Sequence, residues 1–143
     1  MKGINYTHTH THTHTHTPRT TQGTEVKQMR NSDPGMLIGK HAFSSVEFNG
    51  TFFVNTEIDD DYAGIVFNYQ SNKRFMLVAW KQSNQSYWQR SPFSAYATAG
   101  VQIKVVQSDT GPGPMLRNAI WHSRDTPREV RSPWKLHAAC LRV

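Results

Sequence analysis

Apolar and polar residues alternate along several short stretches between residues 46 and 105. Residues 46–48 alternate strictly, and Ile65, Phe67 and Tyr69 alternate with Val66 and Asn68. Residues 51–54 are β-branched and aromatic, and residues 75–80 are apolar on both faces. Successive side chains of a strand point to opposite faces, so these runs predict β-strands, with residues 75–80 as a central one. Together with residues 101–105 they predict at least five strands and an antiparallel all-β sandwich.

The C-terminal third of the chain carries weaker patterns. Val101, Ile103 and Val105 alternate with Gln102 and Lys104, which predicts one buried face and one solvent-facing face. Residues 115–122 form the one candidate helix, with apolar residues four positions apart. Prolines and scattered arginines interrupt the sequence after residue 123, so we expect no further strand of sandwich length there.

The charge of the chain lies at its two ends. The net charge of the 143 residues is +6. Residues 1–30 hold four basic groups and one acidic group, residues 31–122 hold seven of each, and residues 123–143 hold five and two. A neutral middle argues against a nucleic-acid surface, although Lys73, Arg74 and Lys81 flank an aromatic strand. No stretch approaches the roughly 18 apolar residues of a membrane span, so no membrane insertion is expected.

The first 30 residues are of low complexity. Residues 7–16 repeat Thr-His and contain five of the eight histidines. Neutral imidazoles bind zinc, copper and nickel, so a metal-scavenging tract is one interpretation. The other is a tail without defined site geometry, and we expect residues 1–30 to be a disordered flank.

Three adjacent carboxylates, Asp59, Asp60 and Asp61, are the most charged cluster. They repel one another unless a cation compensates, and Ca²⁺ takes its oxygen ligands from carboxylates, carbonyls and water. In an extended stretch Asp59 and Asp61 share a face and could chelate together. A solvated acidic loop is the alternative.

Catalytic interpretations are weaker. Glu57 and one of the three aspartates could form the carboxylate pair of a glycosidase, but acids bunched on one loop do not span a sugar-sized gap. Cys140 lies near His137 in a tail that offers no means of activating the thiol. His41 and His122 are isolated and are expected to be surface or hydrogen-bonding residues. We therefore expect no enzymatic activity.

Several longer stretches follow one another in a specific order and spacing. They are Asn31-Ser-Asp-Pro-Gly35, Phe48-Asn-Gly-Thr-Phe-Phe-Val-Asn-Thr56, Asp59-Asp-Asp-Tyr-Ala-Gly64, Trp80-Lys-Gln82 with Tyr87-Trp88, and Thr110-Gly-Pro-Gly113 with Leu116-Arg-Asn-Ala119. In this order they closely resemble the C-terminal domain of the thrombospondins. The resemblance covers residues 31–135 and about the first half of that domain.

The resemblance implies a concanavalin-like jelly-roll sandwich in a secreted protein of the extracellular matrix. It also implies cell adhesion, with matrix proteins, integrins and an integrin-associated receptor as partners, and it favours Asp59, Asp60 and Asp61 as Ca²⁺ ligands. The segment of Arg74, Phe75, Met76, Leu77 and Val78 corresponds to one proposed to bind that receptor in some family members. Its alternation indicates a buried strand instead, and residues 76, 77 and 79 depart from the family pattern.

Secretion would make sequons meaningful, and Asn49 and Asn84 are candidate glycosylation sites. The family's later strands and preceding modules are absent, so the sandwich is expected to be incomplete, and residues 136–143 match nothing in the family. We interpret the chain as part of a calcium-binding adhesion protein. A carbohydrate-binding lectin-like module is the alternative, which the shared architecture permits.

Overall fold

The computed structural model describes residues 19–22, 25–28, 33–39, 41–45, 47–48, 51 and 62–136. The chain divides into two compact units, Met1–Asn49 and Gly50–Val143. Within the described residues, no helix is both long enough and apolar enough to cross a membrane.

Among its described residues, the first unit contains one small antiparallel pair, β1 (Arg19–Gln22) and β2 (Glu25–Gln28). Only two residues separate the strands in the sequence, a length typical of a tight hairpin. Glu47 and Phe48 are exposed and lie outside any strand, so the strand predicted over residues 46–48 is wrong at both residues that the structure describes. Three alternating residues do not distinguish a strand from an extended loop.

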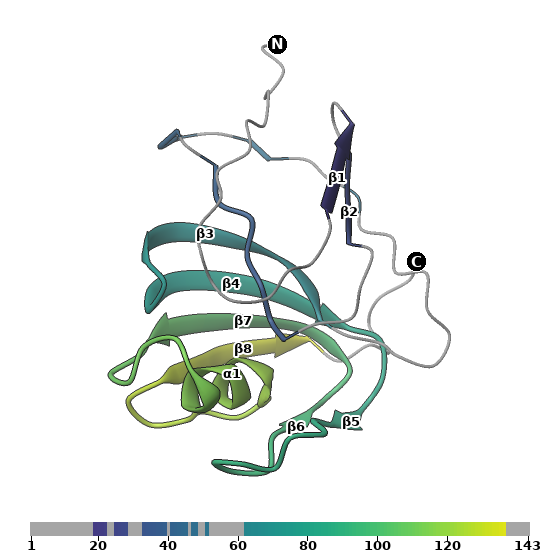
Figure 1. Ribbon diagram of the computed structural model, residues 1–143, viewed down its shortest axis with the longest axis vertical. Coiled ribbons are helices and arrows are strands. Elements are labelled where there is room, and N and C mark those ends of the chain that lie inside the picture. Colours follow the sequence, from purple (N-terminus) through teal and green to yellow (C-terminus); the bar gives the residue numbers. More distant parts are fainter. Residues whose placement is uncertain are drawn as a thin grey trace. The chain divides into compact units, whose positions relative to one another are not determined.

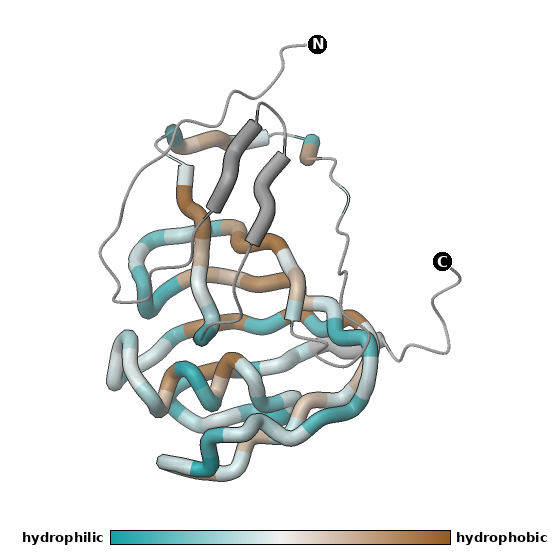
Figure 2. Tube along the Cα trace, turned by 45° about the vertical axis from the view of Figure 1, so that its right-hand side comes forward, coloured by the Kyte–Doolittle hydropathy of each residue, from teal (hydrophilic) through white to brown (hydrophobic). Residues whose placement is uncertain are grey.

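The second unit is built on a four-stranded antiparallel sheet in the order β3-β4-β7-β8 (Figure 1). Its strands are β3 (Ala63–Ser71), β4 (Arg74–Lys81), β7 (Gly100–Gln107) and β8 (Val130–Leu136). A two-residue turn joins β3 to β4, and β4 pairs with β7 from Arg74↔Gln107 to Lys81↔Gly100. Hydrophobic residues run through these central strands (Figure 2). The predicted antiparallel all-β class is confirmed.

The helix α1 (Pro114–Trp121) lies against the face of the sheet formed by β7 and β8 (Figure 1). It begins after Gly113 with Pro114 in its first turn, where the missing amide hydrogen of proline costs nothing. Leu116, Ala119 and Trp121 are buried. The helix predicted over residues 115–122 is confirmed, with bounds one residue earlier at each end.

A small sheet of β5 (Gln85–Ser86) and β6 (Tyr96–Ala97) connects β4 to β7. Ala97 of β6 and the adjoining Tyr87 and Ala95 form a buried cluster with Trp121 at the end of α1. The Trp121 and Tyr87 rings are 5.2 Å apart, within the range of favourable aromatic contacts. This buried cluster fixes the connection to the helix.

β8 corrects the expectation that no strand follows residue 123. Among the described strands it is an outer strand of this sheet, next to β7, with a shift in register between Ile103 and Val105. Pro133 lies opposite this irregularity. Proline cannot donate to a strand ladder, but it is tolerated on outer strands and at bulges. Proline therefore interrupted the sequence pattern without ending the strand.

Candidate functional site

The predicted calcium ligands Asp59, Asp60 and Asp61 lie outside the described residues, as does Glu57. The structure describes the chain again from Tyr62, which directly follows this acidic run. Among the described residues, no group of three or more His, Cys, Asp or Glu side chains is placed to hold a metal ion. The metal assignment therefore stays a prediction.

The predicted receptor segment lies on β4, which has hydrogen-bonded neighbours on both sides. Arg74 is exposed at the start of the strand, Phe75 is 4% exposed, and Met76, Leu77 and Val78 are half-buried. This is the central strand that the alternation predicted. Receptor binding by this segment stays a prediction, and Arg74 is its most accessible member.

The two sequons differ in what the structure describes. Asn49 lies outside the described residues. Asn84 is exposed just before β5, and its side-chain oxygen accepts a hydrogen bond from the amide of Ala99 at 2.8 Å. Its amide nitrogen, the atom that would carry a glycan, is on the other side of the carboxamide. Glycosylation of Asn84 also stays a prediction.

Beneath α1, the sheet buries a cluster of polar and cationic side chains that the sequence reasoning missed. Lys81 on β4 and Lys104 on β7 are both 0% exposed, and Gln102 is 1% exposed. The prediction that Gln102 and Lys104 face solvent is therefore wrong. Their face is the more buried one, whereas Val101, Ile103 and Val105 on the other face are only half-buried.

The ammonium group of Lys104 lies at the C-terminal end of α1. It donates hydrogen bonds to the carbonyl oxygens of Ile120 and, at 3.2 Å, His122. The last carbonyls of a helix lack partners within the helix and carry partial negative charge, so a cation is favourable there. Lys104 thereby connects β7 to the end of α1.

Aromatic rings cover both ammonium groups. The Lys104 Nζ atom is 4.5 Å from the Tyr62 ring centroid, and Lys81 Nζ is 5.0 Å from the Trp121 centroid. Lys81 also donates to the side-chain oxygen of Gln85 at 2.7 Å. Cations over aromatic faces are stabilised most where water is excluded. The arrangement concentrates positive charge beside Tyr62, at the point where the acidic run ends in the sequence.

Gln102 organises the uncharged part of the cluster. Its side-chain nitrogen donates to the Ser123 hydroxyl at 2.6 Å, and the Ser123 hydroxyl also accepts from the Thr98 amide at 2.7 Å. The Tyr62 hydroxyl lies 3.3 Å from the same serine oxygen. Burial raises the pKa of the Tyr62 phenol, an effect only partly opposed by its hydrogen bonds to Ser123 and Gln102.

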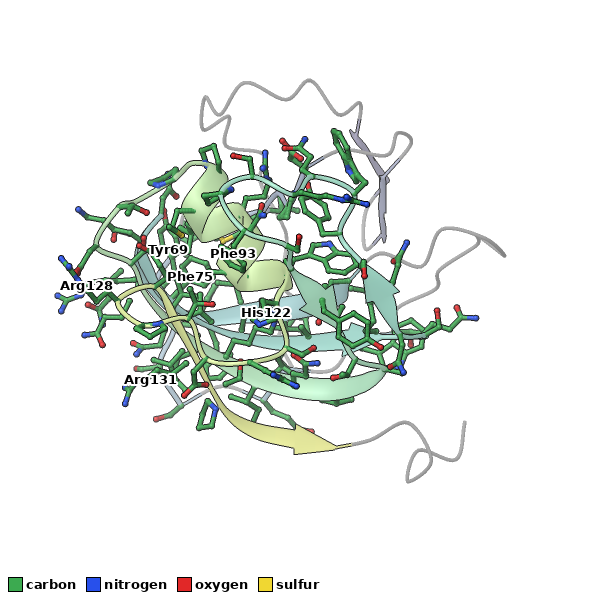
Figure 3. All side chains as sticks on the ribbon, turned by 90° about the horizontal axis from the view of Figure 1, so that it is seen from below. Tyr69, Phe75, Phe93, His122, Arg128 and Arg131 are labelled. Atoms are coloured by element: carbon green, nitrogen blue, oxygen red, sulfur yellow. The ribbon has the colours of Figure 1, made fainter. Side chains whose placement is uncertain are left out.

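Asn118 of α1 holds the connection between β5 and β6. Its side-chain nitrogen lies within hydrogen-bond distance of three backbone oxygens, those of Gln89, Ser91 and Phe93. His122 accepts a hydrogen bond from the Tyr96 amide at 3.0 Å, and its ring meets that of Phe93 edge-on (Figure 3). His122 is thus the hydrogen-bonding residue that the sequence predicted.

These contacts build a rigid support. The described polar groups on the buried face hold the helix end, the β5–β6 connection and Tyr62 in place. Residues far apart in the sequence come together only when β4 pairs with β7. In the sequence, Lys81 and Lys104 each follow an apolar residue, and this pattern does not distinguish a buried lysine from one in solvent.

The remaining candidate residues take no part in this cluster. Cys140 and His137 lie outside the described residues, and His41 is exposed with its ring 6.3 Å from that of Phe43.

Comparison with known proteins identifies relatives over most of the chain. The family model of the thrombospondin C-terminal region matches residues 13–140. The chain is 55% identical over 114 residues to cartilage oligomeric matrix protein of Rattus norvegicus and of Homo sapiens. It is 54% identical over the same length to thrombospondin-4 of Bos taurus.

The alignments cover 80% of this chain but 15% of cartilage oligomeric matrix protein and 12% of thrombospondin-4. The chain thus spans a small part of the length of these relatives. The predicted all-β sandwich and the predicted extracellular-matrix location both agree with this relationship. The chain belongs to the family of the thrombospondin C-terminal region.

Proposed function

We propose that the chain is a calcium-binding, non-enzymatic part of a secreted adhesion protein. It presents the surface of its β-sandwich to matrix proteins and to cell-surface receptors such as integrins and an integrin-associated receptor. The observation that carries the proposal is the family match over residues 13–140, which includes Asp59, Asp60 and Asp61. The names of two relatives, a cartilage matrix protein and a thrombospondin, support the matrix setting.

Calcium is the cofactor that suits the acidic run. Three successive carboxylates raise one another's pKa through repulsion, and a hard divalent cation removes that repulsion. Ca²⁺ accepts six to eight oxygen ligands, so backbone carbonyls and water complete the coordination that two or three aspartates begin. In this proposal calcium binds to the carboxylates that immediately precede Tyr62 in the sequence.

The buried lysines give the acidic run a second candidate role. Lys104 and Lys81 have their ammonium groups 4.5 Å and 6.0 Å from the centre of the Tyr62 ring, and Asp61 is the residue before Tyr62. A buried charge is stable only when it is paired or well hydrogen-bonded, so these carboxylates could balance the lysines without a metal. The two roles predict different responses to calcium.

Calorimetric titration with CaCl₂ distinguishes calcium binding by the aspartates from charge balance with the buried lysines. We expect the full chain to bind Ca²⁺ and the Asp59→Asn/Asp61→Asn double variant to bind at least about tenfold more weakly, since carboxylates are the main ligands of the ion. Saturating calcium should raise the thermal midpoint, because a ligand at about 100 times its Kd stabilises the folded state by about 2.7 kcal/mol.

Asp109→Asn serves as the control, because it removes one exposed carboxylate that pairs with Arg128. Its calcium affinity should equal that of the unchanged chain. Equal binding by the double variant would remove the metal assignment. The charge-balance role predicts two other results. The double variant would melt at a lower temperature than the unchanged chain, and calcium would not alter the thermal midpoint of the unchanged chain.

A further inference from the structure

The two residues that follow α1 hold β6 through both the amide and the carbonyl group of Tyr96. The Tyr96 amide donates to the Nδ1 atom of His122 at 3.0 Å, and the Ser123 amide donates to the Tyr96 carbonyl oxygen at 2.9 Å. β5 and β6 comprise two residues each, so the ladder between them is short. Segments with few backbone hydrogen bonds open locally at a small cost in free energy. The contact with His122 is therefore important for keeping β6 closed.

The direction of this hydrogen bond fixes the protonation state of His122. A backbone amide only donates, so the Nδ1 atom accepts through its lone pair and the neutral ring carries its proton on Nε2. A second proton would occupy the Nδ1 lone pair and turn two donors toward each other. Histidine ordinarily takes up a proton at about pH 6.5, so mild acid is enough to break this bond.

Cations on neighbouring elements oppose a positive charge on the ring. The Lys104 ammonium group of β7 donates to the carbonyl oxygen of His122 itself at 3.2 Å. On α1, the Arg117 guanidinium group donates to the Ser91 carbonyl oxygen at 3.2 Å, within the connection that His122 holds. Like charges that lie close together disfavour the charged form of each group, so protonation adds repulsion at the end of α1.

The other charged and titratable groups around the helix end do not reverse this balance. Arg124 and Asp125 follow closely after His122 in the sequence, and both are exposed. The phenol of Tyr62 is neutral in mild acid, and Lys81 adds a second ammonium group beneath the helix end. Among the described residues named here, four cations thus stand against one acid: Lys81, Lys104, Arg117 and Arg124 against Asp125.

The segment that His122 holds covers apolar side chains. The ring of His122 meets the ring of Phe93 edge-on at 5.7 Å, and Phe93 packs against the buried cluster beneath it (Figure 3). Ala95 and Ala97, on either side of Tyr96, belong to that cluster. Displacement of β6 therefore uncovers its two aromatic members, Tyr87 and Trp121.

The first part of the β5–β6 connection has an attachment that acid does not break. The side-chain nitrogen of Asn118 lies within hydrogen-bond distance of the backbone oxygens of Gln89, Ser91 and Phe93. A carboxamide has no proton to gain in mild acid. The opening is therefore confined to the segment around β6, while the rest of the connection stays attached to α1.

We propose that His122 is an acid-sensitive contact whose protonation releases β6 from the end of α1 and uncovers Tyr87 and Trp121. At about pH 5 the chain then presents an apolar surface that is covered at neutral pH. This regulation goes beyond the adhesion role proposed above and does not rest on it, because neither the His122 ring nor the Tyr96 amide belongs to the acidic run.

Amide hydrogen exchange of the full chain at pH 7.5 and pH 5.0, followed by mass spectrometry and corrected for the intrinsic effect of pH, measures the opening. We expect the opening constant around Tyr96 to rise severalfold at pH 5.0, while β4 and β7 exchange as before. Linkage limits the rise to about 30-fold for a histidine of ordinary pKa that takes up no proton in the closed state. Binding of the apolar dye ANS should increase in parallel.

His122→Asn is the decisive variant, because the asparagine side-chain oxygen can accept from the Tyr96 amide but does not titrate. It should show no rise in opening at pH 5.0. His122→Phe, which keeps a ring but has no acceptor, should open more readily at both pH values. His41→Asn is the matched control, since His41 is an exposed histidine outside this contact, and it should retain the full response to pH. Thermal melts check that each variant is folded.

Two results would overturn the proposal. An equal rise in opening in His122→Asn and in the unchanged chain would show that another group titrates, and slower exchange around Tyr96 at pH 5.0 would show that the proton strengthens the contact. The measurements are repeated with calcium and with EDTA. A response to pH under both conditions supports the His122 contact whether or not calcium binds, whereas a response that calcium abolishes would assign it to the acidic run instead.

Discussion

The burial of Lys104 depends on the carbonyl groups that α1 exposes at its C-terminal end. The long side chain of lysine fills apolar space while its ammonium group meets the oxygens of Ile120 and His122. An alternating sequence shows which residues share a face, but it does not show which face a helix will cover. The alternation of Gln102 and Lys104 with valine and isoleucine therefore predicts correctly that they share a face, but not that this face is buried.

Tyr62 gives the buried cluster a dependence on pH. Burial raises the pKa of its phenol above the ordinary value of 10.0 in the folded chain only. At a pH between the unfolded-state and folded-state pKa values, the phenol therefore keeps its proton in the folded chain and loses it in the unfolded chain. This contribution to stability is complete below pH 10 and is lost as the pH rises through the folded-state pKa.

We therefore expect the thermal midpoint to fall as the pH is raised above about 10, and to fall less steeply in Tyr62→Phe, which has no phenol to titrate. Thermal melts between pH 8 and pH 11.5 measure the difference. Tyr96→Phe, at a tyrosine that is 45% exposed, is the control and should retain the steep decline. The same slope in Tyr62→Phe as in the unchanged chain would contradict the assignment.

At the scale of elements, periodicity predicted the strands that have apolar residues on alternating positions. Periodicity predicts β3, β4 and β7, and it also predicts the helix α1. β8 does not, because Pro133 is compatible with a strand only where the strand has one neighbour or a bulge. The sequence contains no information on which strand will be outermost until the pairing of the whole sheet is known.

The contact between β3 and β4 depends on a residue without a side chain. Gly64 pairs with Ala79, and an added methyl group there would collide with the carbonyl oxygen of Val78 and come within 3.1 Å of the Ala79 Cα atom. Backbone atoms of a central strand cannot move aside independently. The close approach of the two strands thus requires glycine at this position.

Gly64→Ala should lower the free energy of unfolding by about 1–3 kcal/mol, as overpacking of a rigid site does. Urea denaturation measures the change. Gly39→Ala is the matched control, since an added methyl group at Gly39 meets no atom within 4 Å, and it should alter stability little. A Gly64→Ala variant as stable as the Gly39→Ala control would show that the strands separate easily.

At the scale of the whole molecule, the net charge of a sequence segment does not show where charged side chains gather in the fold. The central residues 31–122 are neutral in sum, yet folding places Lys73 and Arg74 beside Arg128, which belongs to the basic C-terminal part. The sequence does not reveal this basic cluster, because only the pairing of β4 with β7 and of β7 with β8 brings the three residues together. Asp59, Asp60 and Asp61, in contrast, are adjacent in the sequence, so the sequence alone suggests them as a candidate site, which stays a prediction.

Glycosylation of the exposed Asn84 tests whether the whole protein is secreted. Expressed in a secretory cell, the chain should carry a glycan at Asn84 that peptide-N-glycosidase removes, because the residue is exposed and lies in an Asn-Gln-Ser sequon. Mass spectrometry should show that Asn84→Gln loses the mass of one glycan. Asn72→Gln, at an asparagine outside any sequon, should lose none. An unchanged glycan mass in Asn84→Gln would exclude the site.

Both outer strands of the described sheet are irregular. β8 carries Pro133 and a shift in register, and β3 has a register shift after Phe67 with Asn68 at a positive φ of 49°. Regular outer strands act as templates on which further chains add and aggregate, and prolines and bulges interrupt such templates. Irregularity at the margins of this sheet therefore protects the protein from fibril formation where matrix proteins accumulate at high local concentration.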